Sequence, residues 1–363
     1  MVESVVNVGP AAAPYPVIVG EGLDLAALTG EHLAPGPAVI LTDSTVGPLH
    51  AAAVQEALRS AGWSVLDEIE VPAGESSKSF ETYSHVVRRV ARAGLTRDGA
   101  IFALGGGVVG DLGGFVAGTY MRGVDLVMLP TSLLAMVDSS VGGKTGVDLP
   151  EGKNLAGVFL RPRLVAADLA WLDSLPDAEI SHGLAEVVKM GLLAGGDYFT
   201  ALDRTEAARA RDLETLTALV LHSVRFKAEV VAEDERESGR RAILNYGHTV
   251  GHGLEAAADY DLPHGQAVAV GMMAAAHLSR QRYGMDLTPI HRERLTAAGL
   301  PTSVPGFEVT KILRIMSRDK KRRYDNGHTE HHRFVLLEDV GRPVWDVTVT
   351  KEEVLRAMET IVD

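Results

Sequence analysis

The stretch AIFALGGGVVGD, residues 100–111, joins a short apolar run to a glycine-rich turn. Residues 100–104 fit a buried strand, and the glycines after it fit a turn that opens a helix. Other apolar runs of this kind alternate with helical patterns through the first half of the chain: strands at 16–20, 38–42, 64–71 and 124–129, and helices at 46–61 and 78–93. Such alternation predicts an α/β domain with an open, largely parallel, Rossmann-like sheet.

After Pro176 the pattern changes to long helical segments: 177–196, 205–233, 247–258, 265–283, 289–298 and 309–317. An exception is RFVLL, residues 333–337, which is typical of a strand or one arm of a hairpin. We therefore expect a boundary near residue 175. The α/β domain would span 1–175, and a mainly α-helical domain would span 176–363.

The totals limit the class of function. A length of 363 residues is enough for two domains, each with its own core. The net charge of −13 argues against nucleic acid and anionic membrane as partners. The chain contains no cysteine, so any bound metal must be held by His, Asp or Glu. The first residues lack a secretion signal, and no apolar run approaches the roughly 20 residues needed to span a bilayer. We expect a cytoplasmic protein.

The glycine turn fits a dinucleotide site. Gly105, Gly107 and Gly110 satisfy G-x-G-x-x-G between a predicted strand and a predicted helix, where backbone amides can approach a pyrophosphate. The acid expected about 20 residues later is missing, because Pro130 stands there. Asp43, at the end of an earlier strand, is an alternative ribose ligand or else a helix N-cap.

A second glycine segment, Gly142-Gly-Lys144-Thr145, resembles the end of a P-loop. A P-loop requires glycine at position 138, where this chain has Asp138. We therefore reject an ATPase. The segment belongs to VGGKTGVDLPEGKNLAG, residues 141–157, which also carries Lys153 and Asn154. It is too rich in glycine for a stable helix and too apolar for a disordered linker, so it predicts a functional loop.

Three histidines gather in LNYGHTVGHGLEAAADYDLPH, residues 244–264. Helical spacing places His248, His252 and Glu255 on one face, and a turn then delivers His264 to the start of the next helix. Imidazoles on adjacent turns, with a third at a following helix start, predict a divalent-metal site. The alternative is a set of solvated or core histidines.

Charged residues also occur in apolar surroundings. Glu186 and Lys189 share one helix face in LAEVVKMGLL, where an ion pair would be buried. Buried charge is costly unless a metal or an anion compensates it. Lys227, Arg240 and Arg241 precede the histidine cluster. Carboxylates, cations and a dinucleotide loop together indicate oxidation of a phosphorylated substrate that bears hydroxyl groups.

The residues resemble the 3-dehydroquinate synthase family of sugar-phosphate cyclases over almost the whole chain. The resemblance rests on GGGVVGD (105–111), TYMRG (119–123), PTSLLAMVDSSVGGKTGVD (130–148), GKNLAG (152–157), GLAEVVKMG (183–191), RAILNYGHTVGHGLE (241–255), HGQAVAVGM (264–272) and RDKK (318–321). It implies the fold of that family and a requirement for NAD and Zn²⁺ or Co²⁺.

The resemblance also implies roles for individual residues. The metal ligands would be Glu186, His248 and His264, which makes His252 a substrate residue. The residues that hold NAD would be Asp43, Glu75, Lys78, Gly105, Gly106, Gly107, Val108, Gly110, Asp111, Thr131, Ser132, Lys144 and Lys153. The residues around the substrate would be Asp138, Lys144, Asn154, Lys189, Lys227, Arg241, Asn245, His252 and Lys320. Arg122 would reach the substrate phosphate of a neighbouring subunit, which implies a homodimer.

The reaction that the resemblance implies converts 3-deoxy-D-arabino-heptulosonate 7-phosphate to 3-dehydroquinate and inorganic phosphate. It proceeds by transient oxidation with NAD, phosphate elimination, re-reduction and an intramolecular aldol closure. Alternatives are a sister cyclase acting on sedoheptulose 7-phosphate or glucose 6-phosphate, a metal-dependent polyol dehydrogenase, and a non-enzymatic binding protein. The sister cyclases alter the residues that match Arg241, Asn245 and His252, whereas this chain keeps all three.

Overall fold

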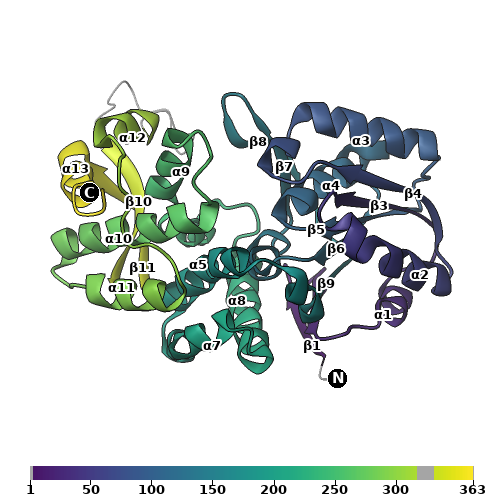
Figure 1. The fold of residues 1–363 in the computed structure, drawn as a ribbon, viewed down its shortest axis with the longest axis horizontal. Helices are drawn as coiled ribbons and strands as arrows, with labels where there is room; N and C mark the ends of the chain where they lie inside the picture. The colour runs from purple at the N-terminus through teal and green to yellow at the C-terminus, as the bar shows by residue number, and fades with distance from the viewer. Residues whose placement is uncertain (1–2, 317–330, 363) are drawn as a thin grey trace. The chain divides into compact units, whose positions relative to one another are not determined.

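The computed structural model describes residues 3–316 and 331–362. The chain forms two compact units (Figure 1). The first comprises Met1–Pro176 and Lys227–Arg236, and the second comprises Asp177–Phe226 and Glu237–Asp363. Within the described residues, no helix is both long enough and apolar enough to cross a membrane.

The first unit is built on a seven-stranded sheet with the order β1-β2-β9-β6-β5-β3-β4. β1 pairs antiparallel with β2, and the other pairs are parallel. The strands are β1 (Ser4–Val8), β2 (Tyr15–Gly20), β3 (Pro37–Asp43), β4 (Ser64–Val71), β5 (Ala100–Gly105), β6 (Asp125–Pro130) and β9 (Leu164–Asp168). The predicted, largely parallel sheet is thus confirmed. The sequence pattern did not predict β1, at the edge of the sheet, or β9, in its interior. Both are short apolar segments of five residues without a helical pattern directly beside them.

Helices cover both faces of this sheet, in line with a parallel sheet buried on two sides. The main ones are α1 (Leu25–His32), α2 (Ala52–Ser60), α3 (Phe80–Ala93) and α4 (Gly107–Thr119). Ile40 and Phe102 belong to a core cluster that includes residues of α1 and α2. On the opposite face, a Cβ at Gly113 of α4 would lie 3.0 Å from the Cβ of Ala103. Neighbouring strand residues therefore pack under different helices.

The order of the strands reverses between β3 and β5. The chain leaves β3 through α2 toward β4, and it leaves β5 through α4 toward β6 on the other side. Asp43 ends β3 and Gly105 ends β5, at the same edge of the sheet. In open parallel sheets, ligands bind outside the carboxyl ends of the strands where the order reverses.

Residues 144–159 form a hairpin, where the sequence predicts a loop. β7 (Lys144–Leu149) pairs antiparallel with β8 (Gly152–Phe159). The hairpin packs on α4, because a Cβ at Gly118 would lie 2.5 Å from Cγ2 of Val158. The glycines of α4 thus leave room for a strand, a long-range effect that the local composition of residues 141–157 does not reveal.

The second unit is mainly helical. Its helices are α5 (Asp177–Ala194), α6 (Gly196–Ala201), α7 (Thr205–Arg209), α8 (Leu213–Glu233, which continues into the first unit at Lys227), α9 (His248–Ala257), α10 (His264–Tyr283), α11 (Thr288–Ala297), α12 (Val309–Met316) and α13 (Lys351–Met358). Most of α10 is buried. The predicted single helix over 205–233 is wrong: Arg211 has a φ of 66°, and Asp212 caps a new helix by accepting from the backbone N–H of Thr215 at 2.9 Å.

A hairpin completes the second unit. The predicted strand at 333–337 lies in β10 (His331–Asp339), which pairs antiparallel with β11 (Arg342–Thr350). Short helical turns complete the described elements: η1 (Gly47–Ala51), η2 (Glu75–Ser77), η3 (Tyr120–Arg122), η4 (Ala135–Ser139), η5 (Leu169–Ser174), η6 (Leu202–Arg204) and η7 (Arg240–Asn245).

Candidate metal and dinucleotide sites

Close packing of three helices in the second unit brings one acid and two histidines together. His264 is the first residue of α10, and a Cβ at the next residue, Gly265, would lie 2.5 Å from the Cα of His182 in α5. Glu186 follows His182 by one helical turn, so this contact sets His264 beside Glu186. Gly271 permits a similar approach of α10 to the start of α9, where a Cβ would lie 2.0 Å from the carbonyl oxygen of Gly247. His248 follows directly.

Glu186, His248 and His264 can share one metal ion. Their potential ligand atoms all lie within 4.8 Å of one another. Oε1 of Glu186 is 3.6 Å from Nε2 of His248 and 3.6 Å from Nε2 of His264, and Glu186 is fully buried. These distances are too long for hydrogen bonds, so Oε1 faces two ring nitrogens without bonding to either. Two imidazoles and one carboxylate suit a divalent ion such as Zn²⁺, which in catalytic sites binds three protein ligands and keeps a further position for water or substrate.

Each imidazole is oriented from behind through Nδ1. Nδ1 of His248 lies 3.1 Å from the carbonyl oxygen of Tyr246 and donates to it. Nδ1 of His264 lies 3.3 Å from Oε1 of Glu255. Both contacts favour the tautomer in which Nε2 carries a lone pair toward Glu186. Glu255 therefore stands behind the candidate ligand His264, although its helical face with His248 and His252 made it a candidate ligand by spacing alone.

The charges around Glu186 keep it ionised. Burial raises the pKa of Glu186, but Lys189 and His264 more than offset this and lower it to about 2. Burial likewise lowers the pKa of His264, and Glu186 and Glu255 reverse the effect and raise it to about 9. Burial, with Lys189 and the neighbouring imidazoles, holds the pKa of His248 well below its usual value. The anionic carboxylate of Glu186 and the neutral imidazole of His248 are the forms that bind metals, whereas His264 must release a proton to bind an ion.

The other predicted substrate residues of the second unit lie on nearby elements. Lys189 is buried in α5 and forms an ion pair with Oε2 of Glu186. The His252 ring lies 5.3 Å from the His248 ring between centroids. Arg241, 2% exposed, and Asn245 belong to η7. Asn245 donates through Nδ2 to Oε1 of Glu237 at 2.6 Å. The sequence did not point to Glu237, since an acid in ERESGRR resembles ordinary surface charge.

The glycine loop of the first unit has little space for side chains. It begins at the carboxyl end of β5, and a Cβ at Gly105 would lie 2.7 Å from that of Val109. A small cavity at this point is lined by Gly105, Gly106, Gly110, Pro130 and Ser139, among others. Thr131 donates its backbone N–H to the Gly105 carbonyl at 3.0 Å. The start of a helix offers backbone N–H groups to an anion, so the start of α4 suits the pyrophosphate of a dinucleotide.

Asp43 acts as a helix cap in the structure. Its Oδ1 accepts from the backbone N–H of Thr45 at 2.9 Å and of Val46 at 3.0 Å. The capping alternative from the sequence is therefore present. A contact of Asp43 with ribose stays a prediction, supported by the place of Asp43 at the carboxyl end of β3 beside the strand-order reversal.

The charged residues assigned to NAD pair with one another. Lys78, which is buried, binds Oδ2 of Asp111 at 2.5 Å, and Lys153 lies 3.2 Å from Oε1 of Glu75. Burial acts to lower the pKa of Lys78, and Asp111 and Glu75 more than offset this and raise it. Val108 and Ser132 are half-buried near the same loop.

Further predicted substrate residues lie elsewhere in the first unit. Lys227 donates through Nζ to the carbonyl oxygen of Asp138 at 2.6 Å and to its carboxylate at 2.5 Å. Lys144 and Asn154 are exposed on the hairpin, and Asn154 has a φ of 54°. Arg122 is exposed in a left-handed turn after α4. Lys320 lies outside the described residues.

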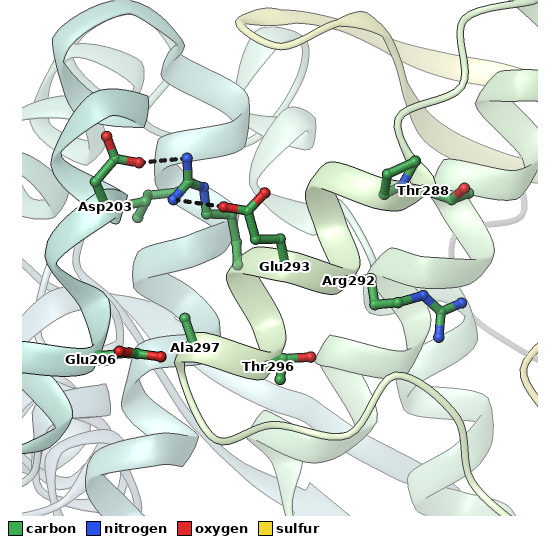
Figure 2. Close-up of a pocket in the computed structure, with 10 residues that line it drawn as sticks. Asp203, Glu206, Thr288, Arg292, Glu293, Thr296 and Ala297 are labelled. Atoms are coloured by element: carbon green, nitrogen blue, oxygen red, sulfur yellow. Dashed lines mark ion pairs between the residues drawn. The ribbon is translucent and has the colours of Figure 1, made fainter.

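One well-formed pocket does not coincide with these residues. It measures about 660 Å³ and lies in the second unit beside α11 (Figure 2). Arg294, which lines this pocket, forms ion pairs with Asp203 at 2.5 Å and with Glu293 at 3.6 Å. No predicted site residue lines it. The chemistry therefore points to the candidate metal cluster and the glycine loop rather than to this pocket.

Family models match both halves of the chain. Residues 68–182 match the family model described as 3-dehydroquinate synthase N-terminal, and residues 183–322 match 3-dehydroquinate synthase C-terminal. A 3-dehydroquinate synthase from Acidithiobacillus ferrooxidans is 46% identical, over 91% of this chain and 90% of the relative.

Solved structures of related cyclases share the fold. A 2-deoxy-scyllo-inosose synthase complexed with carbaglucose-6-phosphate, NAD⁺ and Co²⁺ has a TM-score of 0.90 at 27% identity, covering 98% of this chain and all of that chain. A 2-epi-5-epi-valiolone synthase from Streptomyces hygroscopicus subsp. jinggangensis, with NAD⁺ and Zn²⁺ bound, has a TM-score of 0.85 at 25% identity, with coverages of 96% and 97%. Both halves of the chain match models of one family, and a curated relative is similar over nearly the full length. The chain therefore belongs to the 3-dehydroquinate synthase family.

Proposed function

We propose that the protein is a 3-dehydroquinate synthase of the shikimate pathway, which leads to chorismate and the aromatic amino acids. It converts 3-deoxy-D-arabino-heptulosonate 7-phosphate to 3-dehydroquinate and inorganic phosphate, as a carbon–oxygen lyase acting in the cytoplasm. The observation that carries the proposal is the cluster of buried Glu186 and His248 with half-buried His264, in a chain whose two halves match this family.

The residues fit the two groups that the reaction requires. NAD supplies an acceptor and donor of hydride, and a divalent ion, Zn²⁺ or Co²⁺, supplies a Lewis acid. Glu186 would hold the ion with a carboxylate, and His248 and His264 would hold it through Nε2. The loop from Gly105 to Asp111 would hold the pyrophosphate, with Glu75, Lys78, Thr131, Ser132 and Lys153 around it.

Cations in the second unit suit the negative charge of the substrate, which carries a carboxylate and a phosphate. Arg241 offers a planar fork of donors that can bind a carboxylate or phosphate through two hydrogen bonds. Lys189 offers a compact charge directly beside Glu186. Asn245, held by Glu237, and His252 would orient substrate hydroxyls.

Residues of the first unit complete the assignment. Asp138 is bound by Lys227, which fixes both groups in place before a substrate arrives. Lys144 and Asn154 lie exposed on the β7–β8 hairpin and can donate to substrate oxygens. Lys320 is assigned to the substrate on the resemblance of RDKK alone.

A direct assay tests the proposal. The purified protein, incubated with the heptulosonate phosphate, NAD and zinc, should release inorganic phosphate and form 3-dehydroquinate without net NADH. Glucose 6-phosphate and sedoheptulose 7-phosphate should release none, and release from either would instead indicate a sister cyclase. Steady accumulation of NADH from simple polyols would indicate a dehydrogenase. His264→Ala should abolish both zinc binding and turnover.

The proposal includes a homodimer in which Arg122 reaches the substrate phosphate of the neighbouring subunit. Its support is the exposed, left-handed turn that carries Arg122. Arg122→Ala and Glu186→Gln should each be inactive alone. Mixed under conditions that exchange subunits, they should regain partial activity, because one mixed site has both an intact metal cluster and the partner's arginine. No recovery from a mixture that does exchange would place Arg122 in its own subunit's site.

A further inference from the structure

A buried carboxylate lies behind one of the two imidazoles of the metal cluster. Glu255 is 2% exposed, in the last part of α9, and its Oε1 lies 3.3 Å from Nδ1 of His264. Nε2 of the same ring points to Oε1 of Glu186 at 3.6 Å. His264 thus stands between two carboxylates, one on each ring nitrogen.

We propose that Glu255 is a positioning residue for the metal site: it fixes the tautomer and orientation of His264 and strengthens Nε2 as a donor to a divalent cation. The inference rests on the proposed function and deepens it, since it adds a residue to the Glu186–His248–His264 cluster. A carboxylate that accepts from Nδ1 of a ligating histidine raises the basicity of the ring.

The packing of α9 explains why Glu255 can serve this role. The start of the helix is held against α10 at Gly251, where a Cβ would lie 3.2 Å from the carbonyl oxygen of Ala267. Glu255 follows His248 by seven residues, two helical turns, so both side chains leave the same face. Helix α9 therefore carries both the ligand His248 and Glu255, which supports the other histidine ligand, His264.

The other imidazole has a support of different chemistry. His248 donates to a main-chain carbonyl, that of Tyr246, which carries no net charge. A burial as complete as that of Glu255 is costly for a carboxylate without compensating contacts. The charged support on His264 is therefore a specific feature of this ligand, and a side-chain substitution can remove it without touching either ligand.

The test compares Glu255→Gln and Glu255→Ala with wild type. Zinc affinity is measured on the metal-stripped full chain by competition with a fluorescent chelator, without NAD or substrate. Gln keeps a hydrogen-bond acceptor and loses the charge, and Ala loses both, so we expect affinity to fall about 10-fold for Gln and up to about 100-fold for Ala. The visible absorption spectrum of bound Co²⁺ should also change in Glu255→Ala, because His264 is free to turn.

Glu179→Gln is a matched control. Oε1 of Glu179 lies 3.2 Å from Nδ1 of His182, which is a glutamate–histidine contact one helical turn before Glu186. The substitution Glu179→Gln removes one carboxylate charge, as Glu255→Gln does, but the histidine beside Glu179 is not a proposed metal ligand. The zinc affinity and the Co²⁺ spectrum of this variant should match wild type.

The outcomes separate the inference from the function on which it rests. Wild-type affinity in both Glu255 variants would overturn the positioning role, and so would an equal loss in Glu179→Gln. If wild type binds no zinc, or if His264→Ala binds it as tightly as wild type, the metal cluster itself is wrong and the inference falls with it. Should Glu255→Ala fail to fold, Glu255→Gln decides the matter.

Discussion

The hydroxyl of Tyr246 lies 2.8 Å from Nε2 of His291, in a part of the second unit where both side chains are fully buried. Nδ1 of His291 lies 2.8 Å from the carbonyl oxygen of Leu287 and donates to it. Nε2 therefore accepts the hydroxyl proton of Tyr246, so the folded protein requires a neutral imidazole. Tyr246 in turn offers its carbonyl oxygen to His248, which links this buried pair to a candidate metal ligand.

The pair predicts a loss of stability in mild acid. Burial lowers the pKa of His291 from 6.5 to about 4, against an opposing contribution from Leu287. As the pH falls, the imidazole of His291 is therefore protonated in the unfolded chain at a higher pH than in the folded protein. The stabilisation is complete above about pH 6.5 and is lost as the pH falls toward 4. At 1.36 kcal/mol per pH unit it amounts to about 3 kcal/mol in all, and to about 2 kcal/mol at pH 5.

Urea denaturation at pH 7.5 and at pH 5 measures this difference. His291→Gln keeps an acceptor for Tyr246 and cannot become charged, so its free energy of unfolding should change less between the two pH values than that of wild type. An identical change in both proteins would remove His291 as the cause.

Gly265→Ala should damage folding and metal binding together. The added Cβ would lie 2.5 Å from backbone atoms of His182, so α10 must move away from α5 and carry His264 away from Glu186. Overpacking of this kind costs about 1–3 kcal/mol. We expect a lower midpoint in urea and zinc affinity reduced by about 10-fold or more, as for loss of a support to a ligand.

Gly30→Ala is the control for this change. Gly30 lies in α1, and a Cβ there would meet nothing within 4 Å. Replacing glycine by alanine inside a helix stabilises by about 0.5–1 kcal/mol where space allows. Equal losses in the two variants would show that the contact with His182 is not the cause.

The sequence predicts the parallel sheet well and the additions to it poorly. The strands at 38–42, 64–71, 100–104 and 124–129 are continuous apolar runs beside helical patterns, and local periodicity suffices for them. The β7–β8 hairpin depends on glycines of α4 that make room for Thr145 and Val158. Residues 141–157 do not contain that information, because the contact is made by α4. This helix begins at Gly107, 34 residues before Val141 at the start of the stretch.

The candidate metal cluster shows the same limit. Helical spacing groups His248, His252 and Glu255, yet the structure brings Glu186 into the cluster and sets Glu255 behind His264. Glu186 is far from the histidines in the chain, and its approach depends on Gly265 packing on α5. Only the family resemblance pointed to Glu186, His248 and His264 as a set. The apolar surroundings of Glu186 and Lys189 did indicate burial, and both are buried.

Arg241→Ala should affect the substrate much more than NAD. Arg241 is buried in η7 beside the residues that precede α9, and its charge suits an anionic group of the substrate. Loss of a charged hydrogen bond to a ligand costs about 2–5 kcal/mol, so kcat/KM should fall by at least about 30-fold. NAD affinity, measured by fluorescence titration, should stay within about twofold, since the expected change there is well below 1.4 kcal/mol.

Arg280→Ala serves as the control for Arg241. Arg280 is exposed on α10 and forms an ion pair with Asp286 at 3.1 Å. An exposed pair contributes little, so this variant should keep the kcat/KM of wild type. A similar loss of NAD affinity and of kcat/KM in Arg241→Ala would instead point to a general defect in folding.

The ion pair of Lys78 and Asp111 should be more costly to break than to replace. Lys78→Met leaves the carboxylate of Asp111, on α4, without its closest cation, and breaking a buried pair costs about 3–5 kcal/mol. In the double variant Lys78→Met, Asp111→Leu neither charge of the pair is left, so its loss of stability should be smaller than the sum for the single variants. Arg163→Met, at an exposed pair with Asp125, should cost less than about 1 kcal/mol.

Urea denaturation of the four variants checks this, and additive losses would mean that the two side chains act independently. NAD affinity should fall in the double variant even if stability returns, because both groups are assigned to the dinucleotide; recovery of stability with full NAD affinity would confine the pair to a structural role.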